Sequence, residues 1–186
     1  MVSTPTQHNP TTAAGGKAVD LAQHHAIEQH YFYEARLLQN ADYRTWLKEL
    51  VAPDIHYWMP IVELRMARDK RPPPTPDDAA IFNDDYDVLT MRVERMYTGQ
   101  VWMEDPASRI RYTISNVEAY HTDRADEFEV YCNFVIHRHR RQDERSMHIG
   151  GREDVLRSTA SGYQLVRRKI NLDARVVQDK NLYFFA

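Results

Sequence analysis

The stretch EFEVYCNFVIHRHR, residues 127–140, decides the fold of this chain. Its even-numbered positions from Val130 to Ile136 are all apolar, and they alternate with a second set that includes Tyr131 and Val135. A period of two is typical of a β-strand, because successive side chains point to opposite faces of a sheet. Apolar residues on both faces favour a central strand or a strand that covers a partner.

Further strand-like runs lie on either side of this stretch. They span residues 109–121, 147–158 and 163–173. Short polar connections separate consecutive runs, at residues 122–126, 141–144 and 159–162. Connections of this kind join antiparallel neighbours. The second half of the chain is therefore predicted to form an antiparallel meander.

The first half of the chain is predicted to begin with two helices. A core-facing stripe with helical spacing runs along the first one and consists of Ile27, Tyr31, Ala35 and Leu38. Asp42 is suited to cap a second, short helix, since its carboxylate can accept a hydrogen bond from a backbone amide of the first turn.

A strand, a stiff loop and a third helix are predicted between these helices and the meander. Residues 55–61 are rich in aromatic and branched side chains, as strands are. Residues 65–78 are charged and rich in proline, which predicts an extended loop without core-forming residues. Asp84 or Asp85 can cap the third helix. The residues expected on its inward face are Val88, Met91 and Met96.

Helices followed by an antiparallel meander predict an α+β fold. Residues 1–17 are polar and contain Pro5 and Pro10, so we expect a tail that cannot bury enough surface to order itself. Residues 18–186 are expected to form a single α+β domain, which is long enough to bury a hydrophobic core.

Composition excludes several classes of function. A net charge of −3 gives no electrostatic footprint for nucleic acid or for an anionic membrane. No apolar run approaches the roughly 20 residues of a membrane-spanning helix, and the N-terminus lacks the apolar core of a signal peptide. The only cysteine, Cys132, excludes an internal disulfide. We therefore expect a cytoplasmic protein with no nucleic-acid or membrane partner.

The cysteine count also limits redox chemistry. A Rieske cluster needs two cysteines and two histidines, so this chain cannot hold one. The best local candidates for a metal site are His137 and His139, which share one face of the predicted strand. The arginines around them carry positive charge that disfavours a cation, and no carboxylate is placed nearby by spacing. The chain is predicted to bind no metal, and these histidines are interpreted as interface donors.

Several short segments, taken in order, resemble one protein family. They are EARLL (34–38), DIHYWMP (54–60), DPASR (105–109), ISNV (114–117) and GREDVLR (151–157). Together they resemble the small, or beta, subunit of Rieske-type aromatic-ring dioxygenases, and within these the toluene/biphenyl group, which includes the biphenyl and cumene dioxygenases. Gln39 after the paired leucines and Ala186 after the paired phenylalanines depart from the usual pattern of that group. These departures bear on the substrate more than on the family.

The resemblance implies a cone-shaped fold of the nuclear-transport-factor-2-like, or cystatin-like, class, with a curved antiparallel sheet wrapped around N-terminal helices. It also implies an assembly of three large and three small subunits, in which the small subunits form a trimer. The large subunit would hold the Rieske [2Fe-2S] cluster and a mononuclear non-haem iron, and would convert arenes and dioxygen to cis-dihydrodiols. Electrons would come from NADH through a reductase and a ferredoxin. The small subunit would support the large one without an active site or cofactor of its own.

The cone fold leaves an enzymatic alternative open. Relatives of this fold, such as scytalone dehydratase and ketosteroid isomerase, work inside the cone with acidic and basic side chains. In this chain, such a set could consist of Tyr31, Asp54, His56, Tyr57 and Asp173. The competing interpretation is that the aromatic side chains fill the cone and that the carboxylates bind arginines or backbone amides.

Contacts with a partner are predicted from the arginine content. Nineteen of the 24 basic residues are arginines, whose weakly hydrated, forked guanidinium groups suit protein interfaces. A codon bias in a GC-rich genome would produce the same excess. The candidates for such contacts are Trp58, Arg138, Arg140, Arg141, Arg167 and Arg168.

Overall fold

Two helices open the described part of the chain, which this computed structural model gives as residues 16–61, 63, 65–101, 104–174, 177, 179 and 182–186. α1 spans Leu21–Gln39 and α2 spans Tyr43–Leu50. Asp20 and Asp42 cap them, since each carboxylate accepts a hydrogen bond from the backbone amide three residues later. The predicted helices are thereby confirmed.

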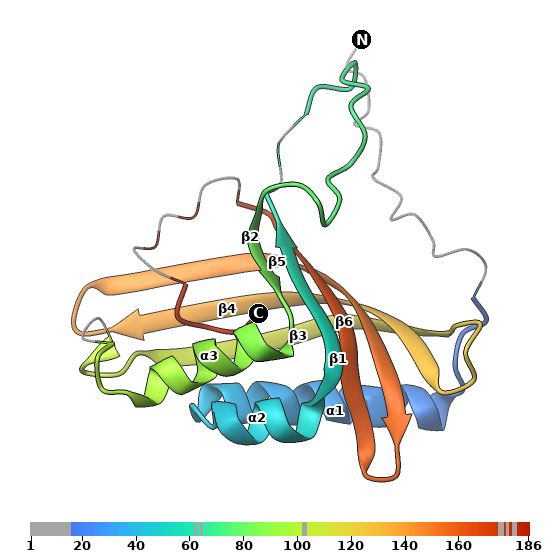
Figure 1. Cartoon of the computed structure of the whole chain (residues 1–186), viewed down its shortest axis with the longest axis horizontal. Helices are drawn as coiled ribbons and strands as arrows, with labels where there is room; N and C mark the ends of the chain where they lie inside the picture. Colours follow the sequence, from blue (N-terminus) through green and yellow to red (C-terminus); the bar gives the residue numbers. More distant parts are fainter. Residues whose placement is uncertain are drawn as a thin grey trace.

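A curved sheet of six strands covers these helices, in the order β2-β1-β6-β5-β4-β3. The strands are β1 (Val51–Pro60), β2 (Ala80–Asp84), β3 (Arg109–His121), β4 (Glu127–Arg140), β5 (Glu144–Thr159) and β6 (Gly162–Leu172). The sheet bends around α1 to form a cone, and Figure 1 shows β1 and β6 crossing the view steeply while β3 and β4 run along its width. The predicted α+β cone fold is confirmed.

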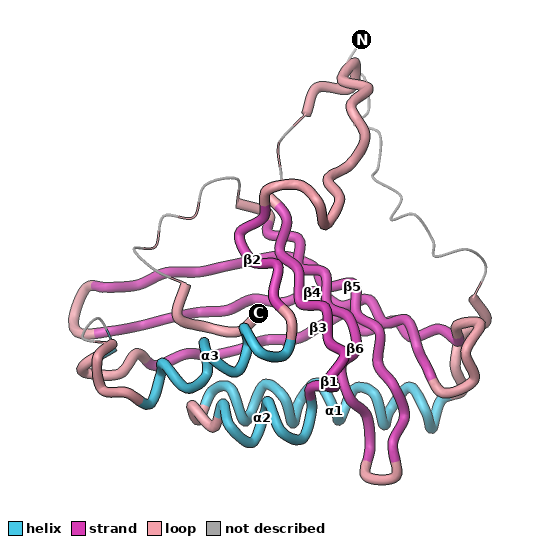
Figure 2. The backbone as a smooth tube through the Cα atoms, in the orientation of Figure 1, coloured by secondary structure: helices cyan, strands magenta, loops and turns pink. Residues whose placement is uncertain are grey.

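One pair of strands corrects the prediction of an antiparallel sheet. The four strands of the meander are antiparallel neighbours as predicted, and β1 also pairs antiparallel with β2. β1 and β6, however, run parallel, with His56 opposite Arg167. Figure 2 shows the strands of this sheet. The sheet is mixed, because the chain crosses to the far edge after β2 and returns through the meander to reach β1 in the same direction.

The segment before α1 lies along the edge strand β3. The backbone carbonyl of Lys17 accepts a hydrogen bond of 2.9 Å from His121, and the amide of Val19 donates one of 3.1 Å to Ala119. The predicted tail, residues 1–17, falls outside the described residues as far as residue 15. The division into a tail and one domain stays a prediction.

The third helix, α3, spans Tyr86–Tyr97 and is capped by Asp85. Its inward residues are Leu89 and Val93, both fully buried, whereas Met91 is 64% exposed. The predicted inward face was therefore wrong for Met91, whereas Met96 is half-buried and packs against the core. Leu89 and Val93 were missed, because a single sequence does not reveal which side of a short helix meets the sheet.

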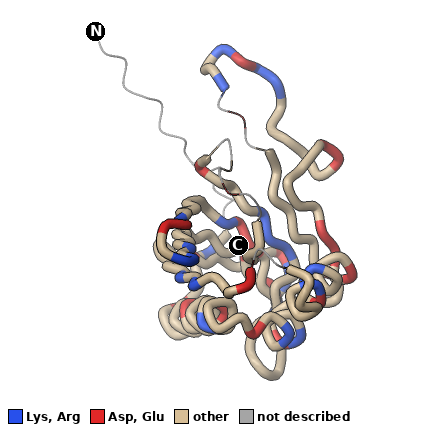
Figure 3. Tube along the Cα trace, turned by 90° about the vertical axis from the view of Figure 1, so that its left-hand side faces the viewer, with Lys and Arg blue, Asp and Glu red and all other residues tan. Residues whose placement is uncertain are grey.

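The connection between β1 and β2 extends away from the body of the molecule, and its outermost part is rich in charged residues (Figures 1 and 3). Arg65 braces this loop by donating hydrogen bonds to the carbonyl oxygens of Arg71 and Pro72, at 2.8 and 2.6 Å. The prediction of a loop without core-forming residues agrees with this placement.

Candidate functional site

The interior of the cone, where enzymes of this fold place their chemistry, contains a buried carboxylate on α1. Glu34 is 2% exposed and lies on the same helical face as Tyr31 and Ala35. Its Oε1 accepts hydrogen bonds from Arg168 at 2.8 Å and from the indole of Trp46 at 3.0 Å. The helix thus delivers one negative charge to the centre of the core.

Three residues of β5 and β6 complete this arrangement. Arg152 donates to Glu34 Oε2 at 3.0 Å, and Arg168 Nη2 donates to Asp154 Oδ2 at 2.7 Å. Tyr31 donates to the same Asp154 oxygen at 2.8 Å. We call Glu34, Arg152, Asp154 and Arg168 the interior ion network. Its two positive and two negative charges balance, as buried charges require.

The electrostatics of the interior ion network do not suit acid–base catalysis. Burial alone would raise the pKa of Glu34, but Arg168 and Arg152 lower it further than burial raises it, so the net pKa lies well below its usual value. Burial and the Asp154 carboxylate hold the pKa of Tyr31 well above its usual value. A general acid or base needs a pKa near the working pH, so these groups keep fixed protonation states.

The mouth of the cone is filled by residues 184–186. Phe184, Phe185 and Ala186 are buried, with at most 2% exposure. Phe185 packs on Trp46 with ring centroids 4.7 Å apart. The hydroxyl of Tyr57 donates to the carbonyl oxygen of Ala186 at 2.6 Å and accepts a hydrogen bond from its amide at 2.8 Å. The interior is a packed core at this end.

The structure does not bring the predicted acid–base set together. Tyr31 and Tyr57 are fully buried inside the cone. Asp54 is on the outside, where its two carboxylate oxygens accept hydrogen bonds from Arg157 at 3.0 and 2.8 Å. His56 and Asp173 also lie outside the core: the ring of His56 bonds to Asn83, and the backbone amide of Asp173 bonds to Ile149.

The arginines predicted to contact a partner divide into two groups. Three of them are buried and bonded within the chain, namely Arg138, Arg140 and Arg168. Arg138 pairs with Glu104 at 2.7 Å, and Arg140 donates to the carbonyl oxygens of Asp105 and Pro106 at 2.8 and 2.9 Å. These contacts fix the loop before β3, so the guanidinium groups of Arg138 and Arg140 stabilise the fold of this chain.

The remaining candidates face outward. The side chains of Arg141 and Arg167 are 54% and 51% exposed. Trp58 is on the outer face of β1, with its ring stacked on that of His56 at a centroid distance of 6.4 Å. Trp58 is 7% exposed, and its indole N–H has no hydrogen-bond partner in the described part of the chain.

No group of three or more histidine, cysteine, aspartate or glutamate side chains that could hold a metal occurs among the described residues. His137 is exposed and His139 half-buried, and neither has a carboxylate partner among those residues. The prediction that the chain binds no metal stays a prediction. Within the same residues, no helix is long and apolar enough to cross a membrane.

Charged residues at core-facing positions of the sequence indicate the interior ion network, although the periodicity of the apolar residues does not reveal it. Glu34 lies on the apolar stripe of α1, three positions after Tyr31, where a charge is costly unless it is paired. On β5, Arg152 and Asp154 lie at alternate positions on the same buried face as Leu156. A charge on a core-facing stripe indicates a buried ion pair, although it does not name the partner.

Comparison with known proteins identifies the family. Residues 33–179 match the family model described as the ring hydroxylating beta subunit. The chain is 35% identical to the biphenyl 2,3-dioxygenase subunit beta of Rhodococcus jostii, over 95% of this chain and 97% of that protein. The chain belongs to the family of ring-hydroxylating dioxygenase beta subunits.

Other relatives agree with this membership. This beta subunit is 35% identical to the benzene 1,2-dioxygenase subunit beta of Pseudomonas putida, over 87% of each chain. It superimposes on a chain of naphthalene 1,2-dioxygenase with a TM-score of 0.83 and 27% identity, covering 90% of this chain and 88% of the other. The resemblance in sequence is thereby confirmed, and the chain is a small subunit of the terminal oxygenase of an aromatic-ring dioxygenase.

The cone fold itself is shared more widely. A structure described as a scytalone dehydratase, from Novosphingobium aromaticivorans, has a TM-score of 0.59 and 13% identity, over 83% of this chain and 86% of the other. At that identity the likeness concerns the fold alone. In this beta subunit, the space that the fold encloses is occupied by the interior ion network.

Proposed function

We propose that this chain is a non-catalytic support for the large subunit of an oxygenase that converts biphenyl- or alkylbenzene-type arenes to cis-dihydrodiols. The observation that carries the proposal is the interior ion network. Its charges neutralise one another inside the cone, at the place where an acid–base site would have to bind a substrate. The substrate class is supported by the identity to beta subunits of biphenyl and benzene dioxygenases.

The proposal assigns the redox chemistry to the partner. A single cysteine cannot hold a Rieske cluster, so the [2Fe-2S] cluster and the mononuclear iron belong in the large subunit. Three copies of each subunit would form the complex, with the small subunits as a trimer, and a reductase and a ferredoxin would supply electrons from NADH. The complex would act in the cytoplasm, without nucleic-acid or membrane partners.

Contacts with the partner are proposed for the outer surface. Arg141 and Arg167 carry exposed guanidinium groups, and Trp58 offers an indole N–H without a hydrogen-bond partner among the described residues. Arginine and tryptophan are enriched where protein interfaces are most stable. Arg138, Arg140 and Arg168 would act indirectly, by fixing the surface on which the partner binds.

The direct test compares the chain alone with the chain purified together with its large subunit. Mass, iron content and arene-dependent oxygen uptake are measured for both preparations, and the oxygen assays contain NADH, the reductase and the ferredoxin. We expect the chain alone to contain no tightly bound iron and to consume no oxygen. The two subunits together should contain iron and should consume oxygen when an arene is present. One iron held stoichiometrically by the isolated chain, or a failure of the subunits to associate, would contradict the proposal.

A second test addresses the enzymatic alternative. Asp54→Asn removes one charge from the exposed pair with Arg157, and we expect turnover of the assembled oxygenase to change by less than about twofold. The non-catalytic role would be contradicted if the complex were fully assembled and stable but its turnover were lowered a hundredfold. Such a loss corresponds to about 2.7 kcal/mol of activation barrier. Glu49→Gln, which alters another exposed carboxylate, controls for a general effect of surface charge.

A further inference from the structure

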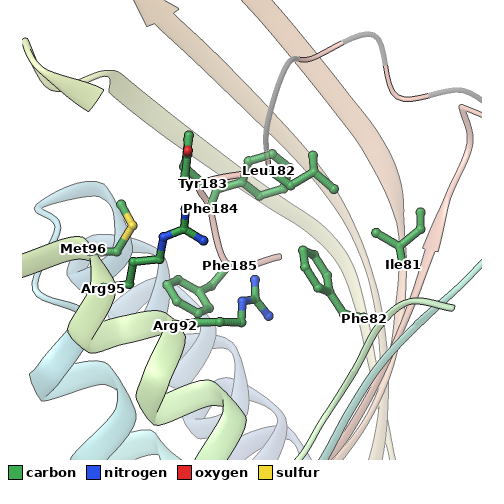
Figure 4. A pocket seen from close by; sticks show the side chains of 9 residues that line it. All are labelled: Ile81, Phe82, Arg92, Arg95, Met96, Leu182, Tyr183, Phe184 and Phe185. Carbon is green, nitrogen blue, oxygen red and sulfur yellow. The ribbon is translucent and has the colours of Figure 1, made fainter. Parts of the chain in front are cut away.

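A cavity of about 360 Å³ lies between α3, β2 and residues 182–185. Figure 4 shows the guanidinium groups of Arg92 and Arg95 extending from α3 into this space, with that of Arg92 next to the ring of Phe82. Small-molecule sites typically measure about 300–1,000 Å³ and combine an apolar lining with few polar groups. The cavity has both features, and it is separate from the interior ion network.

Arg92 forms a rigid cationic wall of this cavity. Its guanidinium lies 3.8 Å from the ring centroid of Phe82 and 4.8 Å from that of Phe185. It also donates to the carboxylate of Asp84 through Nη1. Stacking and pairing together hold the planar group in place. Its other nitrogens have no hydrogen-bond partner within the described residues.

Arg95 supplies a second cation that is not neutralised. Its side chain is exposed, and within the described residues it makes no ion pair or side-chain hydrogen bond. One helical turn separates it from Arg92, so both guanidinium groups face the same cavity. Asp84 balances only one of the two charges, which leaves a net positive charge beside an aromatic lining.

We propose that this cavity binds a small aromatic carboxylate. The ring of the ligand would pack against Phe82 and Leu182, which are both half-buried, and its carboxylate would accept hydrogen bonds from Arg95 and from the free edge of Arg92. Forked arginine–carboxylate contacts of this kind are stronger than those between neutral groups. A neutral arene of the same shape would leave Arg95 without a partner and would bind more weakly.

This inference goes beyond the support of a large subunit. The proposed substrates of the oxygenase are neutral arenes, whereas the cavity selects an anion. The ligand would therefore be an effector that binds the small subunit, and its site would be distinct from the iron site in the partner. All nine described residues that line the cavity belong to this chain, so binding can be measured without the large subunit.

The test uses 2-naphthoate and its neutral counterpart 2-naphthamide, titrated calorimetrically into the full chain. We expect saturable binding of naphthoate at one site, at least tenfold tighter than that of naphthamide. Arg95→Gln should reduce the affinity for naphthoate at least tenfold and leave that for naphthamide unchanged. Arg36→Gln, which alters an exposed arginine on α1, should retain the preference for the anion.

A steric variant ties the binding to this cavity. Leu182 lines it and is half-buried, so Leu182→Trp should fill the space and abolish the binding of both probes while the thermal midpoint stays close to that of the parent. Equal affinities for the two probes, no saturable binding of naphthoate, or undiminished binding to Leu182→Trp would overturn the proposal. The proposal would also be overturned if the parent chain bound no naphthoate and Arg95→Gln weakened its association with the large subunit. The cavity would then be a contact with the partner protein.

Discussion

Arg168 and Asp154 lie opposite each other on neighbouring strands, with Nη2 of the arginine 2.7 Å from Oδ2 of the aspartate and neither side chain exposed to solvent. Burial would lower the pKa of Arg168, but Asp154 and Glu34 outweigh that effect and hold the pKa well above its usual value. Both groups are therefore charged in the folded protein. Each needs the other, because an isolated charge in a core is strongly unfavourable.

Removal of Arg168 should therefore destabilise the chain severely. Arg168→Met would leave Glu34 and Asp154 without their main counter-charge, and the expected loss of unfolding free energy is about 3–5 kcal/mol. Arg167→Met is the matched control, because the side chain of Arg167 is 51% exposed and its contact with Glu129 is long, at 3.5 Å. This substitution should cost less than about 1 kcal/mol of stability. Urea unfolding of both variants measures the difference. Equal stabilities would show that the interior ion network contributes little.

The paired glycines of β5 should differ sharply in their tolerance of alanine. A Cβ at Gly150 would lie 2.2 Å from the carbonyl oxygen of Asn171 and 3.0 Å from Phe134, whereas a Cβ at Gly151 has no neighbour closer than 3.7 Å. Gly150→Ala forces backbone atoms apart and should cost about 1–3 kcal/mol of stability. Gly151→Ala should stay within about 0.5 kcal/mol of the parent. Thermal unfolding of the two variants checks the contrast, which a tolerant Gly150→Ala would refute.

His30 should make stability depend on pH near neutrality. Burial lowers its pKa; Glu34 opposes this effect in part, and the net pKa remains below the usual value. The unfolded chain therefore takes up a proton at about pH 6.5 before the folded chain does. Stability is fully present above that pH and is lost as the pH falls through the folded pKa.

His30→Phe removes this titration and keeps an aromatic ring against Tyr31 and Tyr163, whose centroids lie 5.7 and 5.9 Å from that of the histidine. We expect the urea midpoint to fall less for the variant than for the parent between pH 7.5 and 5.5. An identical fall in both proteins would mean that His30 does not contribute to the pH dependence.

Trp58 should stabilise the isolated chain through the packing of its ring, and its N–H group should contribute little to that stability. The side chain is 7% exposed, so Trp58→Ala should cost about 3–5 kcal/mol. Trp58→Phe keeps most of the buried ring and gives up an N–H without a partner among the described residues; its cost should be below about 1.5 kcal/mol. In the assembled oxygenase, both variants should retain near-normal turnover per intact complex. A turnover defect in a stable Trp58→Phe complex would indicate a functional role for the indole.

Periodicity predicted those elements whose local pattern agrees with their final environment. Arg109–His121 and Glu127–Arg140 have the predicted bounds, because alternating burial along a strand is already visible in the order of its residues. β2 was missed, since five residues after a proline-rich loop carry too little pattern. The parallel pairing of β1 with β6 could not be predicted from the sequence, because it depends on the path of the chain around the sheet.

The candidate site was less accessible to sequence reasoning than the fold. Asp54 and His56 look chemically useful in sequence, yet they face outward, because a register difference of one residue exchanges the two faces of a strand. Glu34 could be recognised as unusual, but its partner Arg168 lies 134 positions further on. Pairings over such distances are decided by tertiary packing, which no local pattern contains.

The link between Glu34 and Arg168 also determines when the chain can fold. During synthesis, Glu34 leaves the ribosome as part of α1. Arg168, which neutralises its carboxylate, is part of β6 and is synthesised 134 residues later. A nascent chain that ends before β6 would have to bury Glu34 without its main counter-charge. Closure of the core therefore waits for almost the whole chain, as in other proteins dominated by contacts between distant residues. Newly made small subunits would consequently pass through a stage with exposed apolar surface, and this stage ends when β6 docks beside β1.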